Sequence, residues 1–277
     1  MATGQTSQVW ECVEVSSHRH FAMKTLLAEK ARSPEHRKTL FHEAEVPKQL
    51  NHQNIIKIVG IFRDKDNPCF IMEFFPAGSL KSRLVDKKQA SFLREKLDGL
   101  LKQAATALAF TNAKGWVHRD VKPDNFLANG AGELRLIDFA LATRVQKRGM
   151  FGGLFRRKQK AMGTRSYMSP EQILGHALDG RADVYSFGAT CYELVTGRPP
   201  FRGMSSDDLL RKQIAEKPVT PCAHNPDVTE EFGNLVLQML SKKKEDRPKD
   251  FHQILMALRG LRVFKTDAKV DAPPASA

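Results

Sequence analysis

Cysteine, acidic residues and long hydrophobic runs are all scarce in this sequence of 277 residues. The cysteines lie far apart and form no CxxC pair, which excludes the disulfide framework of a small secreted domain and a common form of zinc site. They are Cys12, Cys69, Cys191 and Cys222. Reduced thiols of this kind indicate a cytoplasmic protein, and we expect that location.

No stretch reaches the roughly 18 consecutive apolar residues that a membrane-spanning helix needs, so the sequence predicts no membrane span. The first residues also lack the basic and then apolar pattern of a signal peptide. With 41% hydrophobic and 27% charged residues, the composition is that of a soluble globular protein. The length allows a full hydrophobic core, in one large domain or in two lobes.

The shortage of acidic residues leaves 31 Asp and Glu against 44 Lys and Arg, and a net charge of +13. Such a charge is compatible with nucleic acid, an anionic membrane surface or acidic protein partners. Most of the basic residues are scattered, which favours a solubilising surface instead. No zinc-finger, RNA-recognition or basic-zipper pattern is present, so the sequence does not favour nucleic acid as a partner.

Hydrophobic periodicity predicts strands in the first part of the chain and helices in the remainder. Alternating or continuous apolar residues predict strands over 9–15, 21–26, 55–62 and 69–74. Helical spacing predicts helices over 34–50, 91–114, 206–216, 229–240 and 249–259. Residues 263–277 become polar and end in Pro, Ala and Ser, which predicts a disordered tail.

The most informative stretch is 118–125 (HRDVKPDN), which Asp138 follows thirteen residues after its last position. Asp120, Lys122 and Asn125 can meet Asp138 in one small volume if a short hairpin returns the chain beside Asn125. The set would supply two oxygen ligands for Mg²⁺, a carboxylate to receive a hydroxyl proton, and a cation for a phosphate. Phosphoryl transfer requires these parts.

The order and spacing of these residues resemble the catalytic loop of protein kinases. Residues 21–24 (FAMK) resemble the strand that carries the family's ATP-binding lysine, and 183–188 (DVYSFG) resemble the start of its central helix. Residues 163–172 (GTRSYMSPEQ) resemble the peptide-docking segment, in wording typical of bacterial eukaryotic-like serine/threonine kinases. The resemblance covers about residues 2–260.

This resemblance implies an α+β, two-lobed protein kinase fold. A small N-lobe with an antiparallel sheet would cover 1–75, and a larger, mainly helical C-lobe would cover 76–262. The family's first strand has no evident sequence, because residue 2 already aligns with the glycine-rich loop. We therefore expect that strand to be missing, either because the chain is truncated at its start or because the lobe has one strand fewer.

The resemblance also assigns catalytic roles. Asp120 would orient and deprotonate the acceptor hydroxyl, and Lys122 would neutralise charge on the γ-phosphate. Lys24 would contact the α- and β-phosphates and pair with Glu43 of the helix predicted over 34–50. Lys122, two residues after Asp120, matches the serine/threonine form of the loop.

Nucleotide and metal contacts follow in the same way. Asn125 and Asp138 would hold Mg²⁺, and Asp138 would thereby also bind the nucleotide. The remaining residues expected to contact ATP are Gly4, Val9, Ala22, Met72, Glu73, Phe75 and Leu127.

Three structural contacts are implied as well. Thr164 would hydrogen-bond Asp120 and Lys122, and Asp183 would brace the backbone of the catalytic loop. Glu171 would form a buried ion pair with Arg247.

Some positions depart from the family pattern. Ala140 stands where the family places Gly, and only Gly4 and Val9 match the glycine-rich loop. Pro47 lies four residues after Glu43, where it removes a helical hydrogen bond, so we expect a kink or an early helix end near Glu43.

The segment between Arg144 and Lys160 has seven basic residues, no acidic residue, and no Ser, Thr or Tyr. Because the segment offers no usual phosphorylation site, we hypothesise that an anionic partner orders it, or else contacts of its apolar residues. Those residues are Met150, Phe151, Leu154 and Phe155. The alternative is a mobile, solvated loop.

These patterns predict a serine/threonine protein kinase that transfers the γ-phosphoryl group of Mg-ATP to protein hydroxyls. The alternative is a nucleotide-binding pseudokinase or scaffold with weak or no phosphoryl transfer, which Ala140, Pro47, the degraded glycine loop and the missing first strand favour. The presence of all the expected charged residues favours the active enzyme.

Overall fold

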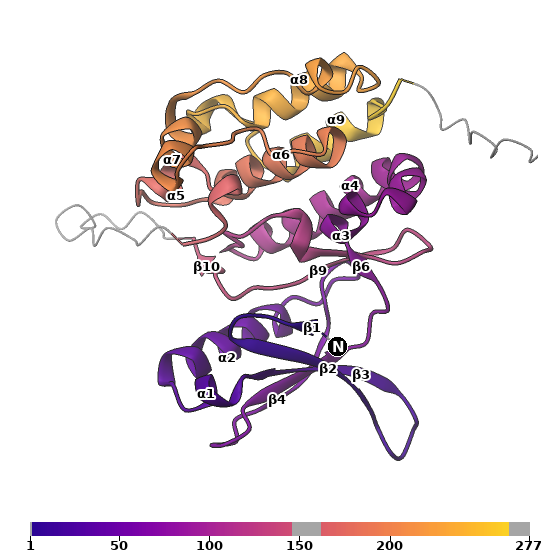
Figure 1. The fold of residues 1–277 in the computed structure, drawn as a ribbon, viewed down its shortest axis with the longest axis vertical. Helices are drawn as coiled ribbons and strands as arrows, with labels where there is room; N and C mark the ends of the chain where they lie inside the picture. Colours follow the sequence, from indigo (N-terminus) through magenta and orange to yellow (C-terminus); the bar gives the residue numbers. More distant parts are fainter. Residues whose placement is uncertain (1, 146–161, 266–277) are drawn as a thin grey trace, which may run out of the picture.

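The computed structural model describes residues 2–145 and 162–265, which form two lobes joined by residues 74–77 (Figure 1). A mainly antiparallel sheet with two helices makes the N-lobe, and helices make most of the C-lobe. The predicted two-lobed α+β fold is therefore confirmed.

The N-lobe sheet contains five strands in the order β1-β2-β3-β5-β4, all pairs antiparallel. They are β1 (Ala2–Thr3), β2 (Ser7–Val13), β3 (His20–Leu26), β4 (Ile58–Phe62) and β5 (Cys69–Glu73). The central strand β3 carries Lys24, which lies opposite Val9 of β2 and Phe70 of β5. This register places the lysine in the middle of the sheet.

The expectation that the first strand is missing is wrong, because β1 supplies a short edge strand. Ala2 lies opposite Val9, and Thr3 lies opposite Gln8. The backbone N–H of Gly4 donates to the carbonyl of Ser7 at 2.9 Å, which closes the turn between the two strands. Two residues are too few to show alternation in a sequence, so patterning cannot detect such a strand.

Helices α1 (Ala28–Ala31) and α2 (Pro34–Lys48) pack beside this sheet (Figure 1). The Ser33 hydroxyl accepts from the backbone N–H of His36 and caps α2, with Pro34 at its first position. Buried side chains of α2 join those of the strands in the N-lobe core: Leu40, Phe41, Ala44, Ile56, Ile58 and Phe70.

The helix does not end early at Glu43, as Pro47 had suggested. It continues through Pro47 to Lys48, so the proline occupies the last turn. There its missing N–H removes the partner of one carbonyl only, that of Glu43. The carbonyls of Val46 and Pro47 accept from Gln49 and Leu50, which completes the helix end.

The C-lobe is built around two long helices whose apolar faces meet in its core. Its helices are α3 (Leu80–Val85), α4 (Ala90–Ala113), α5 (Pro170–Ile173), α6 (Gly180–Thr196), α7 (Ser206–Ala215), α8 (Glu230–Met239) and α9 (Phe251–Gly260). Single 3-10 turns lie at Lys87–Gln89, Pro123–Asn125, Arg165–Tyr167, Pro221–Ala223 and Lys244–Asp246.

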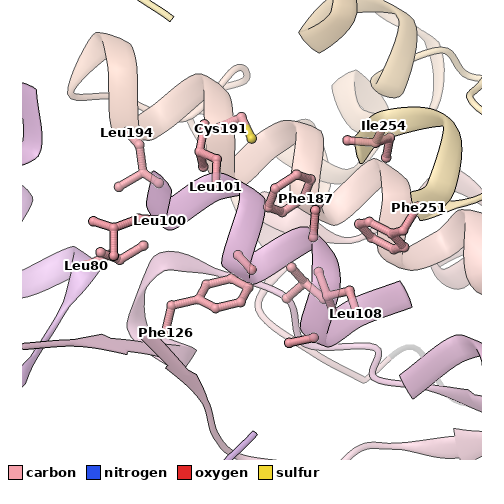
Figure 2. Close-up of a cluster of buried hydrophobic side chains, with 14 of the residues drawn as sticks. Leu80, Leu100, Leu101, Leu108, Phe126, Phe187, Cys191, Leu194, Phe251 and Ile254 are labelled. Atoms are coloured by element: carbon pink, nitrogen blue, oxygen red, sulfur yellow. The ribbon is translucent and has the colours of Figure 1, made fainter. Parts of the chain in front are cut away.

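Figure 2 shows how side chains of α4, α6 and α9 converge in this core. They include Leu100, Leu101, Leu108, Phe187, Cys191, Leu194, Phe251 and Ile254, none more than 4% exposed. Each large apolar side chain buried in this way stabilises the fold by about 1.5–3 kcal/mol. The rigid helical core is what supports the loops that carry the predicted site.

Two small sheets lie between the core and the N-lobe. One has the order β6-β8-β9 and the other pairs β7 with β10. Their strands are β6 (Gly78–Ser79), β7 (Trp116–Val117), β8 (Phe126–Ala128), β9 (Leu134–Leu136) and β10 (Thr143–Arg144). The catalytic stretch 118–125 runs from β7 to β8, and Asp138 follows β9.

The end of the described chain packs onto the C-lobe. Val263 is buried, and Phe264 forms an isolated bridge with Val228. The tail expected from residue 263 therefore begins too early, because these two apolar residues find buried partners. The rest of that expected tail, 266–277, lies outside the described residues.

Candidate active site

The Asp120 carboxylate is the centre of the site, because three side chains and one backbone amide donate to it. Lys122 Nζ donates to Oδ2 at 2.7 Å, and Asn125 Nδ2 donates to the same oxygen at 3.2 Å. The backbone N–H and the hydroxyl of Thr164 both donate to Oδ1 at 3.0 Å. The predicted meeting of these residues is therefore present, and the Lys122 ammonium also donates to the Thr164 hydroxyl at 2.8 Å.

These donors determine the charge of Asp120. Burial raises the pKa of this carboxyl, but Lys122 and the Thr164 hydrogen bond outweigh burial, so the pKa lies below its ordinary value. Asp120 is therefore an anion at neutral pH, in the state that can accept a proton.

The backbone before Asp120 is held by Asp183 at the start of α6, as predicted. The Asp183 oxygens accept from the backbone N–H groups of His118 and Arg119, each at 2.9 Å, and from Asn112 Nδ2 at 2.9 Å. Asp183 is fully buried, which raises the pKa of its carboxyl although the hydrogen bonds oppose this. The brace allows Arg119 to adopt a positive φ of 70°, an unusual conformation for a side chain of this size.

The hairpin of β8 and β9 delivers Asp138 beside Asn125. Leu136 lies opposite Phe126, and the backbone N–H of Ile137 donates to the Asn125 carbonyl at 3.0 Å. Asp138 itself has a φ of 63°, and its Oδ1 accepts from the backbone N–H of Ala140 at 3.3 Å.

Two neighbours fix this conformation. Phe139 is fully buried with its ring 4.7 Å from the ring of His118, which anchors the chain directly after Asp138. Ala140 is not among the described residues with positive φ, so an alanine at this position is unstrained here. The family glycine is not needed for this arrangement of Asp138.

Asn125 and Asp138 fit a Mg²⁺ site. Because both hydrogen bonds of Asn125 leave through Nδ2, to the carbonyl and the carboxylate of Asp120, its Oδ1 has no donor within the described chain. Oδ2 of Asp138 likewise has no hydrogen bond to the residues described. Two such oxygens suit Mg²⁺, which completes its shell with water and substrate phosphates. No cluster of three His, Cys, Asp or Glu residues in the described chain offers an alternative metal site.

Lys24 and Glu43 form the predicted pair between β3 and α2, with Nζ and Oε1 2.5 Å apart. Burial lowers the pKa of Lys24, but attraction to Glu43 and Asp138 outweighs it and raises the pKa above its ordinary value. Burial and the nearby charge of Asp138 raise the pKa of Glu43 to about 7, although Lys24 opposes this. The influence of Asp138 on both groups shows that this pair lies close to the proposed metal ligand.

The other residues expected to bind ATP lie in the N-lobe sheet around Lys24 and its turns, apart from Leu127. Val9 lies opposite Lys24, Gly4 lies in the preceding turn, and Ala22 of β3 lies opposite Met72 of β5. Leu127 lies on β8. Their contacts with the nucleotide stay predictions.

Glu73 and Phe75 stand where β5 leads into the segment between the lobes. Glu73 Oε1 accepts from the backbone N–H of Lys57 and from Arg135 Nε at 3.3 Å. The Arg135 guanidinium also lies 4.7 Å from the Phe75 ring centre. A separate cavity of about 840 Å³ beside α2 and the β4–β5 connection has none of the expected nucleotide residues in its lining.

Sequence reasoning missed two residues that connect these parts. Gln172 donates from Nε2 to the carbonyls of Arg119 and Met162, at 2.8 and 2.6 Å, and so joins the docking segment to the catalytic loop. Glu193 is 2% exposed and bonds to Lys81 at 2.5 Å and to the Tyr167 hydroxyl. A usable signal existed for Glu193, because it is the one charged residue within 184–195.

The basic segment 144–160 lies almost wholly outside the described residues, and so do Met150, Phe151, Leu154 and Phe155, for which contacts were hypothesised. Arg144, its first residue, belongs to β10 and is held by neighbours. None of the described helices is long and apolar enough to cross a membrane.

Comparison with known proteins agrees with this geometry. Residues 1–257 match the model of the protein kinase domain family. The chain is 31% identical over 251 residues to a probable serine/threonine-protein kinase of Streptomyces coelicolor, covering 89% of this chain and 37% of that protein. It is 29% identical over 248 residues to the serine/threonine-protein kinase PknB of Mycobacterium tuberculosis, covering 88% of this chain and 39% of that protein.

A third relative, the serine/threonine-protein kinase PknB of Mycolicibacterium smegmatis, is 32% identical over 248 residues, with 88% and 39% covered. The chain spans less than half the length of these relatives. The family match nevertheless includes both lobes and every residue of the candidate site. On this evidence the chain belongs to the protein kinase domain family, and the relatives that it resembles are bacterial serine/threonine kinases.

Proposed function

We propose that this chain transfers the γ-phosphoryl group of Mg-ATP, the cofactor of its family, to serine or threonine hydroxyls of protein substrates. The observation that carries the proposal is the Asp120 carboxylate, which is charged and held on both oxygens by Lys122, Asn125 and Thr164. Such a group is positioned before substrate arrives, and positioning is the main requirement of this reaction.

The chain's residues would act at defined atoms. Asp120 accepts the proton of the substrate hydroxyl while the substrate oxygen forms a bond to the γ-phosphorus. The bond from that phosphorus to the ADP oxygen breaks. Lys122 and Lys24 are cations that would balance charge on the transferred group and on the remaining phosphates. Bound Mg²⁺, held by Asn125 and Asp138, would neutralise further phosphate charge.

The described site does not support the pseudokinase alternative. Ala140 in place of the family glycine does not favour a pseudokinase, because the alanine follows Asp138 and Phe139 without needing a positive φ. Pro47 does not interrupt α2 at Glu43, and the Lys24–Glu43 pair is formed.

The test is transfer of radiolabelled phosphate from ATP to a generic protein substrate and to the chain itself. We expect Asp120→Asn to reduce the rate by at least about 100-fold, because it removes the proton acceptor. Asp138→Ala should do likewise, because it removes a metal ligand. Transfer by the natural chain at the rate of both variants, with Mg-ATP still bound, would contradict the proposal.

We further propose that an anionic group binds at Arg119. This arginine is 8% exposed, its Nε has no hydrogen-bond partner within the described residues, and burial lowers the pKa of its guanidinium. Asp183 attracts this cation but does not outweigh its burial. A buried guanidinium with an unpartnered Nε is costly, and a further anion would compensate it. We also propose a cytoplasmic location, which the four free cysteines support.

Phosphosite mapping tests the source of that anion. We expect activity without stoichiometric phosphate on 146–163, since this segment has no Ser, Thr or Tyr, and we expect added phosphopeptide or acidic peptide to raise it. Arg119→Met should abolish the response. Activity that depends on a phosphate elsewhere in the chain, with no response to peptide, would contradict an external partner.

A further inference from the structure

A group of side chains that the proposed reaction does not use joins α2 to the chain just after Asp138. We call it the Trp116 cluster. It consists of His42 of α2, Gln49 at the C-cap of α2, Trp116 of β7, and Arg144 of β10. Its members come from three segments far apart in the sequence.

Arg144 makes three of the contacts. Its guanidinium carbon lies 4.3 Å from the centre of the Trp116 ring, directly across the β7–β10 pair. Its NH1 donates to the carbonyl of Lys114 at 2.8 Å, and its NH2 donates to Oε1 of Gln49 at 3.2 Å. One exposed side chain therefore covers a nearly buried indole and reaches across to α2.

His42 makes a second connection from the same helix. Its Nε2 donates to the carbonyl of Ala142 at 2.7 Å, and its ring centre lies 6.0 Å from that of Trp116, edge to face. His42 and Gln49 are seven residues apart, about two helical turns, so both lie on one face of α2. That face rests on β7 and β10.

The two connections lie at either end of the part of α2 that lacks one helical hydrogen bond. Glu43 follows His42, and Pro47 removes the helical partner of the Glu43 carbonyl. The turn from Glu43 to Gln49 thus has one internal hydrogen bond fewer, and the Trp116 cluster holds it from outside at both ends. On the opposite side, Ala142, whose carbonyl contacts His42, and Arg144 of the cluster lie four and six residues after Asp138.

We propose that the Trp116 cluster positions Glu43 relative to Asp138, so that the Lys24–Glu43 pair stands in place for phosphoryl transfer. Its members are positioning residues, since none of them contacts Lys24, Glu43, Asp120 or Asp138 in the hydrogen bonds described. The proposal rests on the proposed kinase activity for its effect on rate, but its effect on α2 is independent of that activity.

The matched variants are Arg144→Met and Arg63→Met. Arg63 resembles Arg144 chemically, because it stacks on an aromatic ring (Phe41, 4.4 Å) and bonds to a side chain of α2 (Glu45). Arg63 directly follows β4, and neither its stacking on Phe41 nor its bond to Glu45 involves β7 or β10. We expect Arg144→Met to lower kcat about tenfold with KM for ATP nearly unchanged, since small misplacement of catalytic groups reduces rate steeply. Arg63→Met should leave both values close to those of the natural chain.

The hydrogen bond between Arg144 and Gln49 allows a rescue experiment. We expect Gln49→Ala to lower kcat and to add little to Arg144→Met, because both remove one connection. The pair Arg144→Lys with Gln49→Glu replaces the hydrogen bond by an ion pair and should recover most of the rate lost in Arg144→Lys alone. Equal kcat in the natural chain, Arg144→Met and Gln49→Ala would overturn the proposal, as would equal losses in Arg144→Met and Arg63→Met.

Amide hydrogen exchange gives a measurement without activity. We expect the amides of residues 44–46, 48 and 49 to exchange faster in Arg144→Met than in the natural chain or in Arg63→Met, because the last turns of α2 lose their outside support. Unchanged exchange there would overturn the proposal. Absence of transfer in the natural chain would overturn the kinase activity instead, and the exchange comparison would still decide the role of the cluster.

Discussion

Glu43 is a group of the site whose charge changes near neutral pH. Its carboxyl is buried and lies near Asp138, and these two influences raise its pKa from 4.5 to about 7 against the attraction of Lys24. Because the pKa of Lys24 is raised, that partner stays charged over the same range. The ion pair therefore depends on Glu43 alone.

We predict that kcat falls as the pH decreases through about 7. A carboxyl with a raised pKa takes up its proton early on acidification, so the pair is complete above this pH and is lost below it. One pH unit below the pKa, only about one-tenth of the molecules keep the charge. Rates measured from about pH 6 to about pH 8 test this.

The variant Glu43→Gln is the control for that profile. It should reduce kcat/KM by about 100-fold and remove the acidic decline, since Lys24 stays charged in this pH range and no other group of the pair then titrates there. The pH dependence of stability has the opposite sign. The folded state binds this proton more tightly than the unfolded chain, so the contribution of Glu43 is favourable at low pH and is lost as pH rises through about 7. An acidic decline that persists in Glu43→Gln would contradict the assignment.

At the scale of single elements, α2 shows where sequence patterns succeed and where they stop. Its start was predictable because Ser33 and Pro34 form a local capping signal. Its end was predictable only to about a turn, because a proline removes one hydrogen bond wherever it stands, and the cost depends on what surrounds it. Here Arg144 donates a hydrogen bond to Gln49 at the end of the helix. Helical periodicity does not reveal a contact between residues 95 positions apart.

The candidate site likewise contains contacts that the sequence could predict and contacts that it could not. Asp120, Lys122 and Asn125 were predictable because they occupy one short loop whose spacing determines their meeting. Glu193 is marked by its isolated charge, but its partners and those of Gln172 were not predictable, because these contacts join segments that neither periodicity nor spacing connects. The short strand β1 was missed for a different reason, since two residues carry no alternation.

At the scale of the whole molecule, one buried ion pair ties the docking segment to the far end of the C-lobe. Arg247 donates to both oxygens of Glu171, at 2.7 and 2.8 Å, as predicted. It also donates to the carbonyls of Arg181, Ser241 and Lys242. The side chains of the pair are 0% and 9% exposed, so water cannot replace either partner. This geometry makes the pair costly to break rather than strongly stabilising in itself.

We predict that Glu171→Gln destabilises the protein by on the order of 3–5 kcal/mol, because it leaves the Arg247 charge buried without its counterion. For a chain of this size that loss should lower Tm by on the order of 10 °C, as measured by thermal unfolding. Replacing both partners, by Glu171→Leu with Arg247→Met, should recover much of the loss, since no buried charge then remains. A Tm for Glu171→Gln within about 2 °C of the natural chain would show that Arg247 finds other compensation, from the carbonyls that it already contacts.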